Sequence, residues 1–206
     1  MYTPIRYTST APATDTMTTA HPFLLLGEPL ALDLVNTRVH RDGTDVDLLD
    51  RPAALDQWLH AERARVDWTG RTGIRELEAI CNLRHELDGL LRARLAHRRG
   101  PAVSVRALNH ALTLPTSGAR LAWDSRGPHK APPRSTARLT ALLRQLATNA
   151  LELLTGPDAN RVHKCAHPDC ILLFLARNPR RRWCSSATCG NRARVARHYR
   201  RAQQTT

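Results

Sequence analysis

Four of the five cysteines in this 206-residue chain fall in two pairs of identical spacing. Four residues separate Cys165 from Cys170 and also Cys184 from Cys189, and thirteen residues lie between the two pairs. Thiolate sulfur is a preferred ligand of zinc, and two short cysteine pairs brought together by a turn supply the tetrahedral ligands of a structural site. The spacing therefore predicts one structural Zn²⁺ ion held by these four residues.

Other uses of the cysteines are less consistent with the sequence. Disulfides need an oxidising compartment, and no feature of the chain indicates secretion. A redox pair would have two residues between its cysteines rather than four. A histidine could replace one cysteine as a zinc ligand, and the candidates are His163, His167 and His198. Cys81 lies on the apolar stripe of a predicted helix, which is typical of a small core residue.

The residues around the cysteines predict a small treble-clef-like finger. Residues 171–175 form an apolar, strand-like run, Asn178 and Pro179 predict a turn, and residues 180–183 predict a return strand. Ser185 or Ser186 can cap a helix from about Ala187 to Gln203, which places Cys189 near the positive helix end that favours a thiolate. The metal supplies the folding energy of such a unit, so the tail should be disordered without zinc.

Positive charge is concentrated in the same part of the chain. The net charge is +13, and residues 160–206 contain eleven Arg or Lys against one acid, so they carry +10 of it. Such a density repels itself unless an anionic partner neutralises it, and nucleic-acid phosphate does so with release of counterions. The candidate nucleic-acid contacts are Arg180, Arg181, Arg182, Arg192, Arg194, Arg197, Arg200 and Arg201.

The helical period divides the basic helix into two faces. Arg194, Arg197 and Arg201 share one face at about 100° per residue. The residues expected nearer the zinc and the hairpin are Cys189, Arg192, Val195, Ala196 and Tyr199. The alternatives are a solvated tail without a partner, an anionic membrane surface, which needs a larger apolar face, and RNA, on whose bases Trp183 or Tyr199 could stack.

The rest of the chain is predicted to be mainly α-helical, because only nine residues are aromatic and Leu, Ala, Val and Ile must fill the core. Helices are expected at 29–37, from Pro52, from Thr72 as cap to about 98, at 104–114 and at 135–156, with a loop at 41–50 and one arm of a short hairpin at 119–123. The predicted organisation is a disordered leader at 1–20, a helical domain at 21–157 and the zinc finger with its basic helix at 158–206.

The helical part shows no convincing catalytic pattern. An active site or metal loop could be imagined from Asp33, Asn36, His40, Asp42, Asp45, Asp47 and Asp50, but their spacing fits no calcium-loop or zinc-protease pattern. A solvated loop is expected instead, with Asn36 and Thr37 either as a helix cap or as a ligand contact. Trp58, Trp68 and Trp123 are expected in or beside the core. Without a recognisable nucleophile, base or phosphate loop, the sequence predicts that the protein is not an enzyme.

Two segments resemble known families. Cys189-Gly190-Asn191-Arg192, with residues 181–184 and 197–201 around it, resembles the CGNR zinc-finger family, although the segment between the cysteine pairs is shorter here. Residues 29–37 resemble the start of the ABATE domain that usually precedes this finger. The resemblance implies a mostly helical domain, a treble-clef finger and a role as a bacterial, stress-related transcription regulator.

These observations predict a zinc-dependent, DNA-binding transcription regulator whose helical domain senses a small-molecule effector or forms a homodimer. RNA binding is one alternative, and a small-molecule binder or enzyme that uses the finger as a tether is another. No apolar run reaches the roughly 18 residues of a membrane span, and no signal-peptide pattern is present. The protein is therefore expected to be soluble and cytoplasmic, without a membrane partner.

Overall fold

The computed structural model describes residues 23, 27–115, 120–131 and 135–203, so the predicted disordered leader at 1–20 lies outside the described residues. The described residues form helices connected by short hairpins, and the predicted mainly α fold is confirmed. The helices are α1 (Leu30–Val35), α2 (Pro52–Ala61), α3 (Ile74–Leu95), α4 (Ala102–Thr113), α5 (Ser135–Thr155) and α6 (Cys189–Gln203), with a 3₁₀ turn at Ala159–Arg161. The strands are β1 (Arg38–Arg41), β2 (Thr44–Asp47), β3 (Arg120–Asp124), β4 (Gly127–Ala131), β5 (Val162–Lys164) and β6 (Leu173–Leu175).

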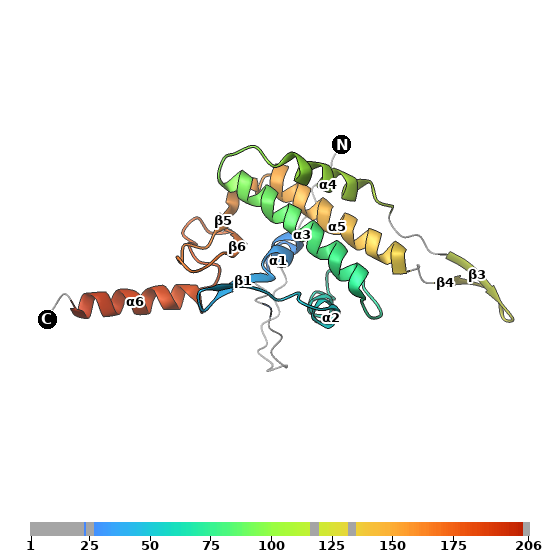
Figure 1. The fold of residues 1–206 in the computed structure, drawn as a ribbon, viewed down its shortest axis with the longest axis horizontal. Helices are drawn as coiled ribbons and strands as arrows, with labels where there is room; N and C mark the ends of the chain where they lie inside the picture. The colour runs from blue at the N-terminus through green and yellow to red at the C-terminus, as the bar shows by residue number, and fades with distance from the viewer. Residues whose placement is uncertain (1–22, 24–26, 116–119, 132–134, 204–206) are drawn as a thin grey trace.

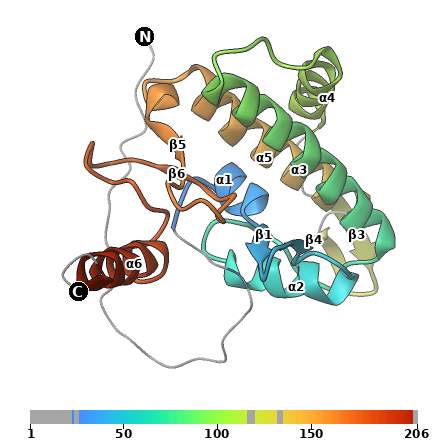
Figure 2. The same cartoon turned by 60° about the vertical axis from the view of Figure 1, so that its left-hand side comes forward.

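The core lies between α3 and α5, which run side by side, with α4 packed against both and the short helix α1 against their other side (Figures 1 and 2). Every residue of α1 is buried, which explains why its sequence is apolar without helical periodicity. Trp58 of α2 and Leu87 and Leu146 of the long helices are completely buried. None of the described helices is long and apolar enough to cross a membrane.

The predicted helix starts need two corrections, one of which is that α4 begins at Ala102 and not at Ser104. Thr72 does not cap α3, because its hydroxyl donates to the carbonyl of Pro52 and ties α3 to the start of α2. The N-cap is Gly73, whose N–H donates to the Glu76 carboxylate at 2.9 Å. Gly156 follows the last residue of α5, as expected. A Cβ atom at this position would lie 2.5 Å from the carbonyl oxygen of Glu152, so only glycine fits there.

The stretch 41–50, expected to be a loop, is instead part of a β-hairpin. Strands β1 and β2 pair antiparallel, with Arg38 opposite Asp47 and His40 opposite Asp45. The turn between them is Asp42-Gly43, in which both residues have positive φ angles of 51° and 79°. Asp-Gly is the pair that such tight hairpin turns prefer, so a local signal was present and the acidic composition concealed it.

A second hairpin, β3–β4, confirms the predicted strand at 119–123 for its described residues, from 120 on. It projects from the helical body at the end opposite to α6 (Figure 1). The prediction that Trp123 lies in or beside the core is wrong, because its side chain is 74% exposed on the hairpin. Trp58 is fully buried as predicted, and Trp68 is partly buried against the core.

The finger packs directly on the helical domain, and the two share one hydrophobic core. The side-chain amide of Asn36, just after α1, donates to the carbonyl of Leu173 at 2.8 Å and accepts from its N–H at 2.9 Å. Glu28 accepts from the N–H of Leu175 at 2.8 Å and from Arg181 at 2.7 Å. Strand β6 is thus held by two buried polar side chains that precede and follow α1.

Asn36→Ala tests this attachment. The substitution leaves the buried N–H and C=O of Leu173 without partners, and each unsatisfied group costs about 1–3 kcal/mol. We therefore expect the free energy of unfolding to fall by roughly 2–5 kcal/mol in urea denaturation. The matched control, Asn109→Ala on the exposed face of α4, should change it by less than about 0.7 kcal/mol. Equal effects of the two substitutions would contradict the proposed attachment.

Candidate zinc centre and nucleic-acid interface

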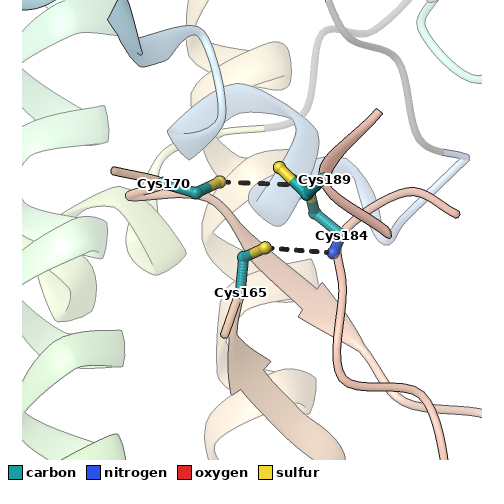
Figure 3. A group of neighbouring side chains, drawn as sticks. All are labelled: Cys165, Cys170, Cys184 and Cys189. Carbon is teal, nitrogen blue, oxygen red and sulfur yellow. Dashed lines mark hydrogen bonds between the residues drawn. The ribbon is translucent and has the colours of Figure 1, made fainter. Parts of the chain in front are cut away.

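The four predicted ligands come from four different places in the finger. Cys165 directly follows β5, Cys170 lies shortly before β6, Cys184 follows the turn beyond β6, and Cys189 is the first residue of α6. Their side chains converge on one point (Figure 3). All four are buried, and none forms a disulfide. The structure thus brings together the complete set of sulfur atoms that the spacing predicts.

The sulfur positions match the demands of zinc. All four Sγ atoms lie within 4.8 Å of one another, with 3.9 Å between Cys170 and Cys184 and 3.6 Å between Cys184 and Cys189. A tetrahedron with Zn–S bonds of about 2.3 Å has sulfur–sulfur edges of about 3.8 Å, whereas a disulfide needs about 2.05 Å. The donor set therefore fits a tetrahedral thiolate site, and the four cysteines form the zinc-binding site of this protein.

The protonation of three of these sulfurs also calls for a cation. Hydrogen bonds from the Cys170 and Cys184 thiols and from backbone N–H groups hold the pKa of Cys165 far below its ordinary value. The neighbouring Cys165 raises the pKa of Cys170 to about 12 and also raises that of Cys184. One thiolate in this cluster thus suppresses ionisation of its neighbours, and a divalent cation is what allows all four to be thiolates.

The predicted histidine alternatives are not supported by the geometry. The group of potential ligands among the described residues consists of the four cysteines alone. His163 packs against Phe174 with ring centroids 6.0 Å apart, and His198 is exposed on α6 beside Tyr199. His167 accepts a hydrogen bond from the N–H of Asp169 at 3.3 Å.

The hairpin of the finger differs from the predicted one. Strand β6 pairs with β5, with Val162 opposite Leu175 and Lys164 opposite Leu173, and residues 180–183 form no strand. The Asn178-Pro179 turn is present, but the chain beyond it is held by side chains. Arg181 donates to the carbonyl of Leu175 at 3.2 Å and so occupies the edge of β6 where a return strand would pair.

Arg181 is therefore a structural residue of the finger and not a surface contact. Its guanidinium group also donates to Glu28 at 2.7 Å and to the carbonyls of Trp183 and Cys184, and it stacks on the ring of Phe174 at 4.5 Å. Because these partners use its donors, we remove Arg181 from the predicted set of nucleic-acid contacts. Arg180 and Arg182 of that set are exposed.

The start of α6 is fixed by close packing around Gly190. The Ser185 hydroxyl oxygen accepts from the N–H groups of Ala187 and Thr188, and the Ser185 carbonyl accepts from Gly190 at 2.9 Å. Ser185 thus caps the turn that leads into α6 and not the helix itself, which begins at Cys189, two residues later than predicted. A Cβ atom at Gly190 would lie 3.3 Å from the Ser185 oxygen and 3.3 Å from the Trp183 ring. A small residue at this position lets the helix approach Trp183 closely.

The faces of α6 also differ from the prediction. Arg192, Val195 and Tyr199 are exposed, although they were expected to point toward the zinc and the hairpin. The helix extends away from the body of the protein beyond its first turn (Figure 1), so only its start contacts the finger closely. A groove of about 460 Å³ runs along the other face of the helix and is lined by Ala166, His167, Pro168, Arg182, Trp183, Ala193, Ala196, Arg197 and Arg200.

The residues considered for an active site in the helical domain have structural partners. Asp33 is buried and pairs with Arg65 at 2.6 Å, and Asn36 binds Leu173 as described. His40 contacts Asp45 at 2.7 Å, whereas Asp42 and Asp50 are exposed. Asp47 pairs with the buried Arg84, which also donates to Thr37 at 2.7 Å. The expected solvated loop is thus wrong for the buried Asp33 and Asn36, whereas Asp47 is exposed but lies in strand β2.

A small polar cavity lies beside this network. Its volume is about 290 Å³, and it is lined by Val35, Arg38, Asp45, Asp47, Arg84, His85 and Asp88. Its three carboxylates are paired, Asp45 with His40, Asp47 with Arg84 and Asp88 with Arg92. The volume is at the lower limit of about 300 Å³ for ligand pockets.

The sequence did not predict the residues that join the finger to the domain. Glu28 and Arg181 are 153 residues apart in sequence. Arg65 donates to the carbonyl of Glu28 at 2.5 Å and to Asp33 and Glu62, so it supports Glu28 from the other side. The Arg65 and Glu28 positions carry no local pattern that could have indicated these contacts.

The fold and the site together define a helical domain followed by a four-cysteine, treble-clef-like zinc finger. Two family models match the chain: the ABATE domain, described as "Putative stress-induced transcription regulator", matches residues 28–157, and the CGNR zinc finger matches residues 161–202. The chain belongs to the ABATE family and carries a CGNR zinc finger at its C-terminal end, which confirms the predicted resemblance. A search of curated proteins finds no match.

Zinc removal is expected to affect the whole protein, because the ligand-bearing strands belong to the common core. Elemental analysis should find one zinc ion per chain, and chelation should lower the Tm by roughly 10 °C or more. Cys184→Ser should lose the zinc and show the same low Tm. The matched control Cys81→Ser, on α3 away from the cluster, should keep its zinc and the Tm of the wild type. A chelated protein with an unchanged Tm would show that the metal does not support this core.

The buried carboxylate of Asp33 predicts a specific pH dependence of stability. Burial raises the pKa of Asp33 from 3.8 to about 7 despite Arg65, and its Oδ1 atom has no hydrogen-bond partner. A raised folded-state pKa adds stability below pH 3.8, and this contribution is lost as the pH rises toward 7. The stability of the wild type relative to Asp33→Asn should thus fall by roughly 2–4 kcal/mol between pH 4 and pH 8. A relative stability that rises with pH would indicate a lowered pKa and contradict this assignment.

Proposed function

We propose that this protein is a non-enzymatic transcription regulator that binds DNA through α6 and the adjoining groove. The observation that carries the proposal is a helix with five exposed arginines and no acidic residue, fixed at its first residue to the zinc site. Such a helix presents its charges in a rigid arrangement, which lowers the entropy lost on binding. Anionic phosphates are the partner that this charge density favours.

The groove beside α6 adds cations from a second segment. Arg182 stacks over the ring of Trp183 at 5.5 Å, and Arg197 and Arg200 line the groove from the helix. His167 lies in the same groove. A concave site lined by guanidinium groups suits a phosphodiester backbone, because arginine donates two parallel hydrogen bonds to phosphate.

The position of Trp183 favours duplex DNA over single-stranded RNA. Single-stranded RNA is recognised largely by stacking of bases on exposed aromatic rings. Here Arg182 lies over the Trp183 ring and Gly190 packs closely against it, so this ring is not free to stack on a base. The exposed Tyr199 is on the face of α6 away from the groove.

The proposal assigns no catalytic step to the helical domain, where the carboxylates that line the cavity are committed to ion pairs. This cavity is the place where a small polar effector would bind, next to the Thr37–Arg84 contact and one residue from Asn36. A site of four thiolates also needs a reducing compartment, so the proposal places the protein in the cytoplasm.

Gel-shift titrations with duplex DNA over a series of salt concentrations test the proposal. Each phosphate contact contributes about −0.9 to the slope of log affinity against log salt concentration. Replacing Arg197 and Arg200 by glutamine should therefore make this negative slope shallower by up to about 1.8 and weaken binding by roughly tenfold or more.

The control for this titration is Arg75→Gln with Arg106→Gln, which removes the same charge from exposed helical positions in the other domain. Its slope and affinity should stay close to those of the wild type. Absence of DNA binding, or equal losses in the two double variants, would refute binding through α6. Tighter binding to single-stranded RNA than to duplex DNA would favour the RNA alternative.

A further inference from the structure

The β3–β4 hairpin exposes apolar side chains that its own domain does not cover. Leu121 is 75% exposed and Trp123 is 74% exposed, and both lie on the same face of β3 because they are two residues apart. The contacts of the two strands are chiefly with each other, and the hairpin stands away from the helical body (Figure 1). An isolated two-stranded hairpin is marginally stable in water, so these exposed groups favour association with another surface.

The two edges of the hairpin differ in their ability to pair. Pro128 of β4 lies opposite Trp123 and has no N–H, so the outer edge of β4 lacks a donor at this position beside the turn. Strand β3 contains no proline and keeps a continuous edge. Asp124 and Gly127 flank the turn and face each other, so by alternation the backbone groups of Leu121 and Trp123 point outward from β3.

The sequence of β3 is complementary to its own reverse. It reads Arg-Leu-Ala-Trp-Asp, so an antiparallel copy centred on Ala122 places a basic position opposite an acidic one at both ends. Leu121 then lies opposite Trp123 twice, and the small residue Ala122 lies opposite itself, where a non-hydrogen-bonded pair brings the strands closest. This charge and size complementarity favours a second copy of the chain as the partner, although within its own hairpin Asp124 also accepts from the N–H of Arg126 and lies 3.6 Å from His129.

We propose that the β3 edge pairs antiparallel with β3 of a second copy, about a two-fold axis at Ala122, to form a four-stranded sheet that makes the protein a homodimer. The two copies of Leu121 and Trp123 cover one another on one face of this sheet. A two-fold axis makes every contact occur twice, so one favourable pair in the sequence counts double. Because the hairpin and α6 lie at opposite ends of each protomer (Figure 1), the two basic helices project from the far ends of the dimer.

Sedimentation equilibrium of the full-length, zinc-loaded protein over a range of concentrations tests the proposal. The wild type should reach twice its chain mass of 23.0 kDa. Trp123→Ser removes two large apolar contacts and should raise the dimer dissociation constant by about 100-fold or more. Its Tm as a dilute monomer should match that of the wild type, because the hairpin lies outside the core.

A charge exchange distinguishes symmetric β3 pairing from other contacts of the same hairpin. Arg120→Asp alone and Asp124→Arg alone each place like charges opposite one another, and each should raise the dissociation constant by roughly tenfold. The double variant restores opposite charges in the reversed order and should recover most of the wild-type affinity. Arg126→Asp, which changes the charge equally at the exposed turn, should have little effect.

A wild type that remains a monomer at all concentrations would overturn the proposal, as would a double variant that is weaker than both single variants. A fall in DNA affinity of Trp123→Ser without any change in mass would assign the hairpin to DNA instead, and would equally overturn it. The readout is mass, so the outcome does not depend on whether α6 binds nucleic acid.

Discussion

Four buried sulfur atoms from separate segments of the finger lie within 4.8 Å of one another, and the arrangement depends on a cation that balances their charge. A thiolate at Cys165 opposes ionisation of Cys170 and Cys184. Zinc removes this opposition and converts a repulsive cluster into a covalent crosslink of β5, β6 and the start of α6. The crosslink reaches further than the finger, because β6 is held by Asn36 and Glu28 of the helical domain.

Arginines in this part of the chain have two different roles that burial separates. Arg181 contacts a carboxylate, three carbonyl groups and the Phe174 ring, so its charge is neutralised within the protein. Arg197 and Arg200 line an open groove and are exposed to solvent. Charge density in the sequence is therefore an upper bound on the charge available to a partner. What distinguishes the two roles is whether an acidic residue from the helical domain reaches the guanidinium group.

The parts of the structure that sequence could predict are those governed by local rules. Cysteine spacing identified the zinc site, and apolar periodicity identified the helices from Pro52 to Gly156 and their approximate ends. The β1–β2 hairpin was also within reach, since Asp42-Gly43 is a recognisable turn. Its alternating charged residues have the composition of a solvated loop, but they pair across the two strands.

Contacts between distant segments could not be predicted in this way. Glu28 meets Arg181, and Asn36 meets Leu173, across 153 and 137 residues of sequence. Strand β5 has three residues, of which one is buried, so it carries no period that could reveal its pairing with β6. The exposure of Trp123 was unexpected for a related reason, because an aromatic residue in an alternating strand is usually covered by its own domain. Here the covering surface is proposed to come from another chain.

One zinc ion bound by four thiolates organises the finger and fixes the start of α6 in place. X-ray absorption spectroscopy at the zinc edge, applied to the purified full-length protein, tests this role of zinc most directly. We expect four sulfur neighbours at about 2.3 Å and no nitrogen neighbour. A first shell that contains nitrogen at about 2.0–2.1 Å, or a protein that folds without stoichiometric zinc, would contradict it.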